Sequence, residues 1–173
     1  LDEVAIDFQI RGPSKSDDQL NDVLLVACRQ DSVQSREDSV NGAGLTCDVI
    51  DVETYALERV FPLLCEFHGL EGKTVGLVDI GASSMSLYVF DEGEVVYSRE
   101  QVFGGNDLTH NLSQVSDMSV DEVERAKKQG GLAEDLIRGY VEPFKQTAAQ
   151  QISRSLQFYH SSGAHAELDV LLL

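Results

Sequence analysis

Basic residues are scarce in this 173-residue sequence: 13 lysines and arginines stand against 30 aspartates and glutamates, for a net charge of −17 at pH 7. So acidic a surface repels phosphate backbones and anionic lipid, which excludes nucleic acid as an expected partner. Long apolar runs are also missing, since none approaches the roughly 20 residues of a membrane-spanning helix. The sequence therefore predicts no direct membrane insertion. A phosphate ligand would need backbone N–H groups and a divalent cation to offset the charge.

Cysteine is rare and follows no metal-binding pattern. The three cysteines, Cys28, Cys47 and Cys65, are odd in number and widely spaced. Each lies in an apolar segment, so we expect reduced cysteines packed in the core. Such cysteines fit a cytosolic compartment.

The composition that remains is that of a soluble globular protein. Apolar residues make up 42% of the chain and charged residues 25%, and the length suits one ordinary domain or two small ones. The first residue is leucine, and the closing "LDVLLL" looks like a core strand that enters a fold. We therefore expect the chain to be part of a larger protein.

Hydrophobic periodicity in the first third predicts strands and helices in alternation. The alternating pattern of residues 3–10 predicts a half-buried strand, and residues 22–29 predict a more fully buried one. A helix over residues 31–45, a strand over 46–52 and a helix over 53–69 follow.

The pattern changes at residues 69–73, which we interpret as the domain boundary. Three consecutive strands follow, joined by "DIGAS" and by "DEGE", a hairpin signal. Helices come next: one after "GGNDL", a second with a capping box of Ser119 and Glu122, and a long amphipathic one that is continuous or joined near Pro143. A final strand closes the chain, and the order predicts mixed α/β sheets.

The "DIGAS" turn is the first candidate site. Asp79 ends an apolar strand, where a buried carboxylate costs several kcal/mol unless it is paired or binds a cation. Gly81 and the small residues Ala82, Ser83 and Ser84 could direct N–H groups at a phosphate while Asp79 holds a hydrated Mg²⁺. The alternative is a hairpin in which the aspartate bonds its own turn.

Three further features fit a phosphate-bearing ligand. Gly104 and Gly105 precede a helix, whose N-terminus is an anion site. Glu124 and Lys127 lie three residues apart and could hold a ribose and a base, or form a solvated surface pair. Glu53 opens a helix after a predicted strand, where it could orient a water or satisfy the charge preference of a helix start.

In combination, these motifs resemble the actin-like ATPases. "VIDVETYAL", "LVDIGASSMSLYV", "FGGNDLT" and "ERAKKQGGL" follow the order of motifs in that superfamily. With "LDEVAIDFQI" and "EPF…ISRSLQFYHSS", nearly the whole chain is similar to the PilM family of type IV pilus assembly (competence) proteins. The resemblance implies an actin-like (ribonuclease H-like) α/β fold with two lobes around a nucleotide. Residues 1–69 would form part of the first lobe, an extra subdomain and its return into the core sheet, and residues 70–173 most of the second.

The resemblance also implies an ATP site. Carried over by position, its residues would be Asp79 (Mg²⁺ through water), Gly81, Ala82, Ser83 and Ser84 (β and γ phosphates), Gly104 and Gly105 (beside the nucleotide), and Glu124 and Lys127 (ribose and adenine). Glu53 would position the attacking water. Ala82 replaces a second glycine of many relatives and Ser86 stands where some carry an acid, so the resemblance implies at most a weak ATPase.

Two of the three nucleotide loops of the superfamily are expected outside these residues. No strand pair for the first phosphate loop occurs, and the chain stops at Leu173 before the adenosine loop. We therefore expect the chain alone to bind nucleotide poorly and to lack activity. Sheet edges left open would favour self-association, including a swapped dimer.

The function implied by the resemblance is that of a cytoplasmic scaffold. It would bind ATP and Mg²⁺, dock the cytoplasmic tail of the membrane protein PilN, and lie at the inner membrane through its partners. Nucleotide would set the arrangement of the lobes. The alternatives are an FtsA-like protein that forms filaments, a sugar kinase or phosphatase of the same superfamily, and a protein-docking domain that binds no nucleotide.

Overall fold

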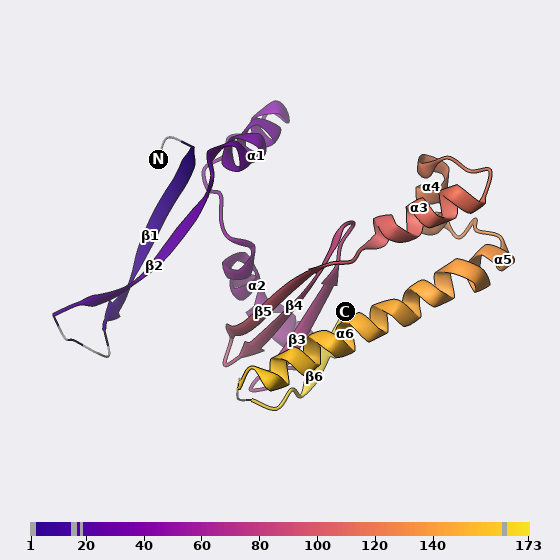
Figure 1. The fold of residues 1–173 in the computed structure, drawn as a ribbon. Helices are drawn as coiled ribbons and strands as arrows, with labels where there is room; N and C mark the ends of the chain where they lie inside the picture. Colours follow the sequence, from indigo (N-terminus) through magenta and orange to yellow (C-terminus); the bar gives the residue numbers. More distant parts are fainter. Residues whose placement is uncertain (1–2, 15–16, 18, 164–165) are drawn as a thin grey trace. The chain divides into compact units, whose positions relative to one another are not determined.

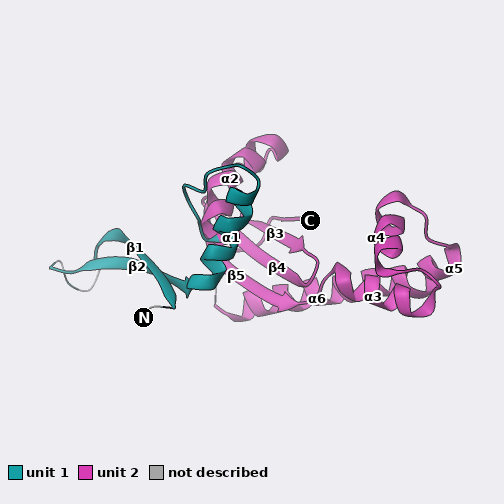
Figure 2. Ribbon diagram, turned by 90° about the horizontal axis from the view of Figure 1, so that it is seen from above, with its two compact units in different colours: residues 1–52 teal, residues 53–173 magenta. Residues whose placement is uncertain are grey.

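The computed structural model describes residues 3–14, 17, 19–163 and 166–173. Contacts divide the chain into two compact units, Leu1–Val52 and Glu53–Leu173 (Figures 1 and 2). The helix that opens the second unit lies before the predicted lobe boundary at residues 69–70, and that boundary stays a prediction.

The first unit is a hairpin followed by a helix. Strand β1 (Val4–Pro13) pairs antiparallel with β2 (Asn21–Arg29), and α1 (Gln30–Gly42) follows directly. The predicted burial of both strands is wrong, because Phe8 and Leu25, a cross-strand pair, are 63% and 65% exposed. The alternation is present, but most of the large apolar side chains of this two-stranded sheet are exposed.

Two other expectations for this unit are corrected. Residues 46–52 form no strand, because no strand in the described part of the chain pairs with their backbone N–H and C=O groups. The cysteines of this unit are not core residues either, since Cys28 of β2 is exposed and Cys47 is only partly buried. Cys65, in the second unit, is partly buried and packs against a core cluster as expected.

The second unit is built on a four-stranded sheet of order β5–β4–β3–β6. The predicted meander is confirmed as the antiparallel strands β3 (Val75–Ile80), β4 (Ser84–Asp91) and β5 (Glu94–Val102), and the final strand, β6 (Val170–Leu172), runs parallel to β3. Glu92 and Gly93 both adopt positive φ, 51° and 89°, as a type I′ hairpin turn requires.

Helices account for most of the rest of this unit. Their bounds are α2 (Glu53–His68), α3 (Gly105–Val115), α4 (Val120–Gln129), α5 (Glu134–Leu136), the π-helix η1 (Ile137–Val141) and α6 (Glu142–Ser161). The predicted capping box is confirmed, since the Ser119 N–H donates to the Glu122 carboxylate at 2.8 Å. The long predicted helix is joined near Pro143, where the π-turn ends and α6 begins. No described helix is long and apolar enough to cross a membrane.

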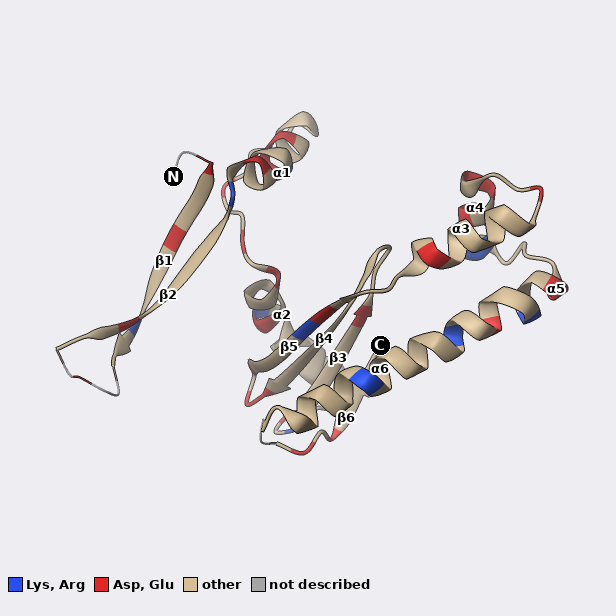
Figure 3. Ribbon diagram, viewed as in Figure 1, with Lys and Arg blue, Asp and Glu red and all other residues tan. Residues whose placement is uncertain are grey.

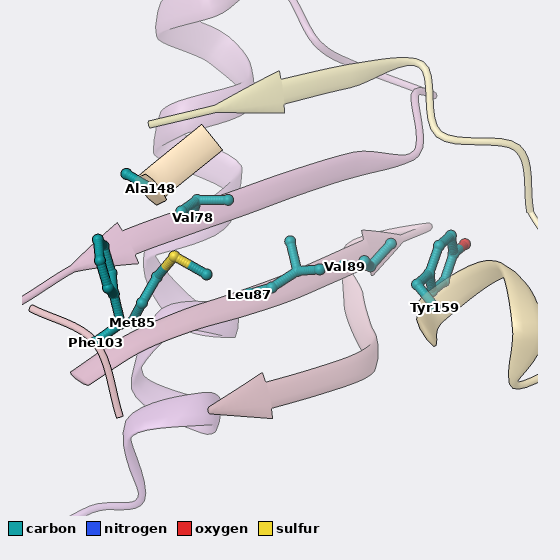
Figure 4. Packing of buried hydrophobic residues seen from close by; sticks show 7 residues of the cluster. All are labelled: Val78, Met85, Leu87, Val89, Phe103, Ala148 and Tyr159. Carbon is teal, nitrogen blue, oxygen red and sulfur yellow. The ribbon is translucent and has the colours of Figure 1, made fainter. Parts of the chain in front are cut away.

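Side chains alternate across β4 and build two cores. Met85, Leu87 and Val89 pack toward α6 in one cluster (Figure 4). Tyr88 and Phe90 pack in a second cluster with Phe61 of α2, and the rings of Phe61 and Phe90 stack 4.0 Å apart. Because successive residues of a strand face opposite ways, α2 and α6 cover opposite faces of the sheet. This three-layer arrangement fixes the end of β3, from which the candidate site projects.

A third cluster holds the two short helices together. Leu108 and Leu112 of α3 are buried against Val123 of α4. The packing gives α4 a fixed position beside the first turn of α3, which the site requires.

Candidate functional site

The "DIGAS" turn docks against the first turn of α3. The Gly81 N–H donates to the Ser84 carbonyl at 2.9 Å and closes the turn. The carbonyls of Gly81 and Ala82 accept hydrogen bonds from the N–H groups of Gly105 (2.9 Å) and Asn106 (2.8 Å). The start of α3 therefore binds the turn itself, and these two N–H groups are not available to an anion as the sequence predicted.

Gly104 makes this close approach possible. A Cβ added at Gly104 would lie 2.4 Å from the carbonyl oxygen of Ala82 and 2.6 Å from the backbone nitrogen of Ser83. Those are backbone atoms that cannot move aside, so no other residue fits without separating the two segments. The two glycine-containing motifs that the sequence predicted to share one site are in direct contact.

Two backbone N–H groups of the turn remain available to a ligand. The N–H groups of Ala82 and Ser83 donate to no acceptor in the described part of the chain. Adjacent N–H groups of this kind form an anion-binding concavity, which fits the predicted contact with phosphate oxygens.

Asp79 differs from its predicted environment. The residue is the second-to-last of β3, lies opposite Ser86, and is exposed instead of buried. Among the described residues, no donor of the turn bonds this carboxylate, which argues against the alternative of an aspartate that caps its own hairpin. No group of three metal-binding side chains occurs in the described residues. A single carboxylate is still enough for Mg²⁺ that keeps its waters and takes its other ligands from phosphates.

Glu124 and Lys127 form a partly buried hydrogen-bond network with Thr109. The Lys127 Nζ donates to Glu124 Oε1 at 2.7 Å, to the Thr109 hydroxyl at 2.6 Å and to the Gly105 carbonyl at 3.0 Å. Their side chains are 33% (Glu124) and 19% (Lys127) exposed, so they are not the fully solvated pair that the sequence left open. The hydrogen bonds from Lys127 and then Thr109 lower the pKa of Glu124 to about 2, against the effect of burial.

Sequence reasoning missed Thr109. Its side chain is 1% exposed, and its hydroxyl contacts Gly105, Glu124 and Lys127. The available signal was its place four residues after Gly105 in a predicted helix, from which a threonine hydroxyl reaches the i−4 carbonyl. Nothing local, however, connects it to α4.

Glu53 lies apart from this network. It is the exposed first residue of α2, and the predicted strand before it does not form. Burial, followed by the charges of Glu53, Glu100 and Asp79, raises the pKa of the Tyr88 hydroxyl, while a hydrogen bond with Ser86 lowers it. Glu53 and Asp79 thus act on one phenol without contacting each other.

The first unit contains a separate apolar pocket of about 510 Å³. Its apolar walls come from β1, β2, α1 and the segment after α1, and consist of Ala5, Ile6, Val26, Val33, Ile50 and Val52. The pocket lies wholly within residues 1–52, so its geometry does not depend on the second unit.

Comparison with known proteins identifies the family. The sequence pattern described as "Type IV pilus assembly protein PilM" matches residues 1–173. The structure is similar to a chain of the PilM-PilN type IV pilus biogenesis complex, with a TM-score of 0.68 and 26% identity over 98% of this chain and 49% of that one. This chain thus spans about half the length of that relative.

Two other known proteins resemble this chain, one in its fold and one in part of its sequence. The ethanolamine utilization protein EutJ from Carboxydothermus hydrogenoformans has the same fold, with a TM-score of 0.55 and 21% identity over 78% of this chain and 44% of EutJ. Cell division protein FtsA from Bacillus subtilis (strain 168) is 39% identical over 59 residues, 34% of this chain and 13% of FtsA. The predicted α/β, actin-like fold class is confirmed. The chain belongs to the PilM family of type IV pilus assembly proteins.

Proposed function

We propose that the protein is a cytoplasmic, ATP-binding scaffold of type IV pilus assembly, held at the inner membrane through its partners. The observation that carries the nucleotide part is the turn after β3, which presents the free N–H groups of Ala82 and Ser83 next to the exposed Asp79. Phosphate oxygens accept from the two N–H groups, and Asp79 holds Mg²⁺ through water.

The negative charge of the protein makes both the N–H groups of the turn and the metal-binding carboxylate of Asp79 necessary for binding a triphosphate. Acidic residues occur throughout both units, and the net charge is −17 (Figure 3). A triphosphate approaching such a surface is repelled unless local donors and a cation offset the field. The ribose and adenine lie toward Glu124 and Lys127, whose network contacts the same turn through Gly105.

Hydrolysis is at most weak. Ser86 faces Asp79 across β3 and β4, where a second carboxylate would help to hold the metal. Glu53, the candidate for positioning water, is the exposed first residue of α2, and no hydrogen bond or ion pair joins it to the turn among the described residues. Nucleotide then acts mainly by favouring one arrangement of the lobes over another.

Calorimetric titration of Mg²⁺-ATP tests the nucleotide site. It is performed on the whole PilM protein that contains these residues, on its Asp79→Ala variant, and on Asp117→Ala, an exposed aspartate between α3 and α4. Loss of a charge-assisted contact to the bound metal predicts affinity weaker by about tenfold or more for Asp79→Ala. The Asp117→Ala variant binds like wild type, and the 173-residue chain alone binds more weakly than the whole protein.

Two results would contradict the nucleotide proposal. Equal affinity of wild type and Asp79→Ala would remove Asp79 from the site. No heat from the whole protein would instead favour the alternative of a docking scaffold without nucleotide.

Docking of the PilN tail is the second part of the proposal. Its support is the membership of the family, the similarity to a chain of the PilM-PilN complex, and an apolar pocket in the first unit. The cytoplasmic tail of PilN would place apolar side chains among those of Ile6, Val26 and Ile50.

Fluorescence anisotropy with a labelled PilN tail peptide tests this part. Ile6→Ser removes an apolar wall of the pocket, while Ile10→Ser changes a similarly exposed isoleucine of β1 outside it. We expect weaker binding by about tenfold for Ile6→Ser, from the lost apolar contact area, and little change for Ile10→Ser. Equal effects of the two substitutions would place the tail elsewhere.

The alternative is an FtsA-like protein that forms filaments, which the 39% identity to FtsA over 59 residues favours. Sedimentation with and without Mg²⁺-ATP separates the two functions. Filaments that pellet only with nucleotide would support the FtsA-like alternative, whereas a scaffold stays in the supernatant in both conditions.

A further inference from the structure

Thr109 lies at the centre of the polar network and has one proton to give. Its buried hydroxyl lies 3.0 Å from the Gly105 carbonyl and also within hydrogen-bond reach of the Glu124 carboxylate. A hydroxyl carries a single proton, so these two acceptors compete for it. Any group that draws Glu124 away leaves that proton to the Gly105 carbonyl.

Lys127 has no proton to spare either. Its ammonium group has three protons, and the structure gives them three acceptors: Glu124, Thr109 and the Gly105 carbonyl. The Gly105 carbonyl therefore accepts from Lys127 and competes with Glu124 for the Thr109 proton. Its polarisation depends on what Glu124 binds.

From Gly105 a chain of peptide groups leads into the turn. The Gly105 carbonyl and the Asn106 N–H belong to one planar peptide. That N–H donates to the Ala82 carbonyl at 2.8 Å, and the Ala82 carbonyl shares its peptide with the Ser83 N–H, one of the two free donors. Hydrogen bonds in series strengthen one another, by roughly 10–30% per bond.

A second series of hydrogen-bonded peptide groups also joins α3 to the turn, but it starts at the Gly104 carbonyl instead of the Gly105 carbonyl. The Gly105 N–H donates to the Gly81 carbonyl at 2.9 Å, and that carbonyl shares its peptide with the Ala82 N–H. The carbonyl at the start of this chain, that of Gly104, accepts from the Asp107 N–H at 3.1 Å. Neither Thr109 nor Lys127 bonds the Gly104 carbonyl. The amides of this second series, Gly105 and Ala82, are therefore the internal control for changes at Asn106 and Ser83.

We propose that Thr109 and Lys127 are positioning residues that set the donor strength of the Ser83 N–H. Through the Gly105 and Ala82 peptides, a ligand hydroxyl that engages Glu124 changes how strongly the turn holds an anion. The identity of the ligand as a nucleotide rests on the proposed function, whereas the chain of peptides is a property of the ligand-free protein. Because coupling is reciprocal, an anion at the turn changes the affinity for the hydroxyl at Glu124 by the same factor.

NMR on the ligand-free chain tests this coupling. Thr109→Val removes the hydroxyl and keeps the shape, Thr109→Ser keeps the hydroxyl, and Thr147→Val removes an exposed hydroxyl that also bonds its i−4 carbonyl, at 3.0 Å. In Thr109→Val we expect the Asn106 amide to exchange about five- to tenfold faster, the change that a net hydrogen bond contributes. The Ser83 amide proton moves upfield, while the Gly105 and Ala82 amides change little.

The controls and a second variant keep the outcome decisive. Thr109→Ser and Thr147→Val retain the wild-type spectrum at Asn106 and Ser83. If Thr109→Val fails to fold, Lys127→Met, at a partly exposed position, is expected to produce the same shift at Ser83. Unchanged Asn106 exchange and Ser83 shift in the folded variants would overturn the coupling. That result would leave the nucleotide proposal intact, because calorimetry tests the latter separately.

Discussion

Gly104 shows how much of the site depends on one missing side chain. Its Cα passes so near the Ala82 backbone that α3 can bond both turn carbonyls. We predict that Gly104→Ala destabilises the protein by about 1–3 kcal/mol, the usual cost of forcing atoms into a close-packed space. Urea unfolding measures the change.

Gly139 provides the matched control for this prediction. A Cβ at Gly139 of η1 would meet no atom within 4 Å, and its φ is not in the left-handed region. Gly139→Ala is therefore expected to be neutral or stabilising by up to about 1 kcal/mol, since alanine restricts the unfolded chain. Equal destabilisation by both substitutions would mean that the approach at Gly104 does not matter for folding.

Glu124 gives the site a pH dependence with a definite sign. Its pKa falls from an ordinary 4.5 to about 2, because Lys127 and Thr109 bond the ionised carboxylate. The stability from these bonds is fully present above pH 4.5 and is lost as the pH falls toward 2. We predict that Glu124→Gln lowers the unfolding free energy by about 1 kcal/mol at pH 7, as a partly exposed pair allows. Unfolding curves between pH 7 and 3 measure how the difference from wild type shrinks.

Glu142 tests whether the effect is specific. It pairs with Lys145 at the same i,i+3 spacing, at 2.8 Å, but both side chains are exposed. Glu142→Gln should change the unfolding free energy by less than about 0.5 kcal/mol. A carbon-detected titration of Glu124 that gives an ordinary carboxyl pKa would contradict the predicted network.

At the scale of elements, the sheet of the second unit is the most completely specified part. In β4, residues 85, 87 and 89 face one helix and residues 88 and 90 face the other, so a strand with almost no polar interruption is buried on both sides. Near-continuous apolar strands of this kind require covering layers on both faces. The helices α2 and α6 supply them.

Phe61 attaches α2 to the sheet. It is buried and stacks on Phe90, whereas Phe67, in the same helix, is exposed. We predict that Phe61→Ala lowers the unfolding free energy by about 3–5 kcal/mol, the cost of a large cavity in a core. Phe67→Ala should stay within about 0.5 kcal/mol of wild type. Thermal and urea unfolding of both variants check this, and a small loss at Phe61 would show that α2 is weakly attached.

The hairpin of the first unit has a regular alternation, but most of its large apolar side chains are exposed. Phe8 and Leu25 face each other across the strands and are both exposed. An isolated two-stranded hairpin is marginally stable in water. The exposed apolar pairs are therefore the surface of this unit that is most prone to associate with another molecule.

At the scale of the whole molecule, two forces oppose each other. The net charge of −17 favours separation of copies, while the exposed apolar residues of β1 and β2 favour association. We predict that the 173-residue chain self-associates as its concentration rises, and more strongly in high salt, because salt screens the repulsion. Light scattering over a tenfold range of concentration measures it.

A double variant, Phe8→Ser with Leu25→Ser, identifies the surface. It removes one cross-strand apolar pair and should shift the onset of association to higher concentration. A chain that stays monomeric throughout the range would show that repulsion prevails.

The sequence by itself determined features that depend on near neighbours. The alternation of β4, the capping box of Ser119 and Glu122, and the turn at Glu92 and Gly93 each arise within two to four residues, where propensity and local hydrogen bonds act directly. The order of motifs likewise identified the family and located the turn between β3 and β4. These parts of the fold were predictable, whereas the binding role of the turn stays a prediction.

Only the tertiary structure decided which donor meets which acceptor across the chain. Residues 46–52 have the pattern of a strand but find no described partner, and Asp79 lies near the end of an apolar strand yet is exposed. The first N–H groups of α3 bond the turn instead of an anion, and Thr109 joins α3 to α4. The physical reason is that burial and hydrogen bonding depend on segments brought together from distant positions, and no local pattern encodes where a partner will lie.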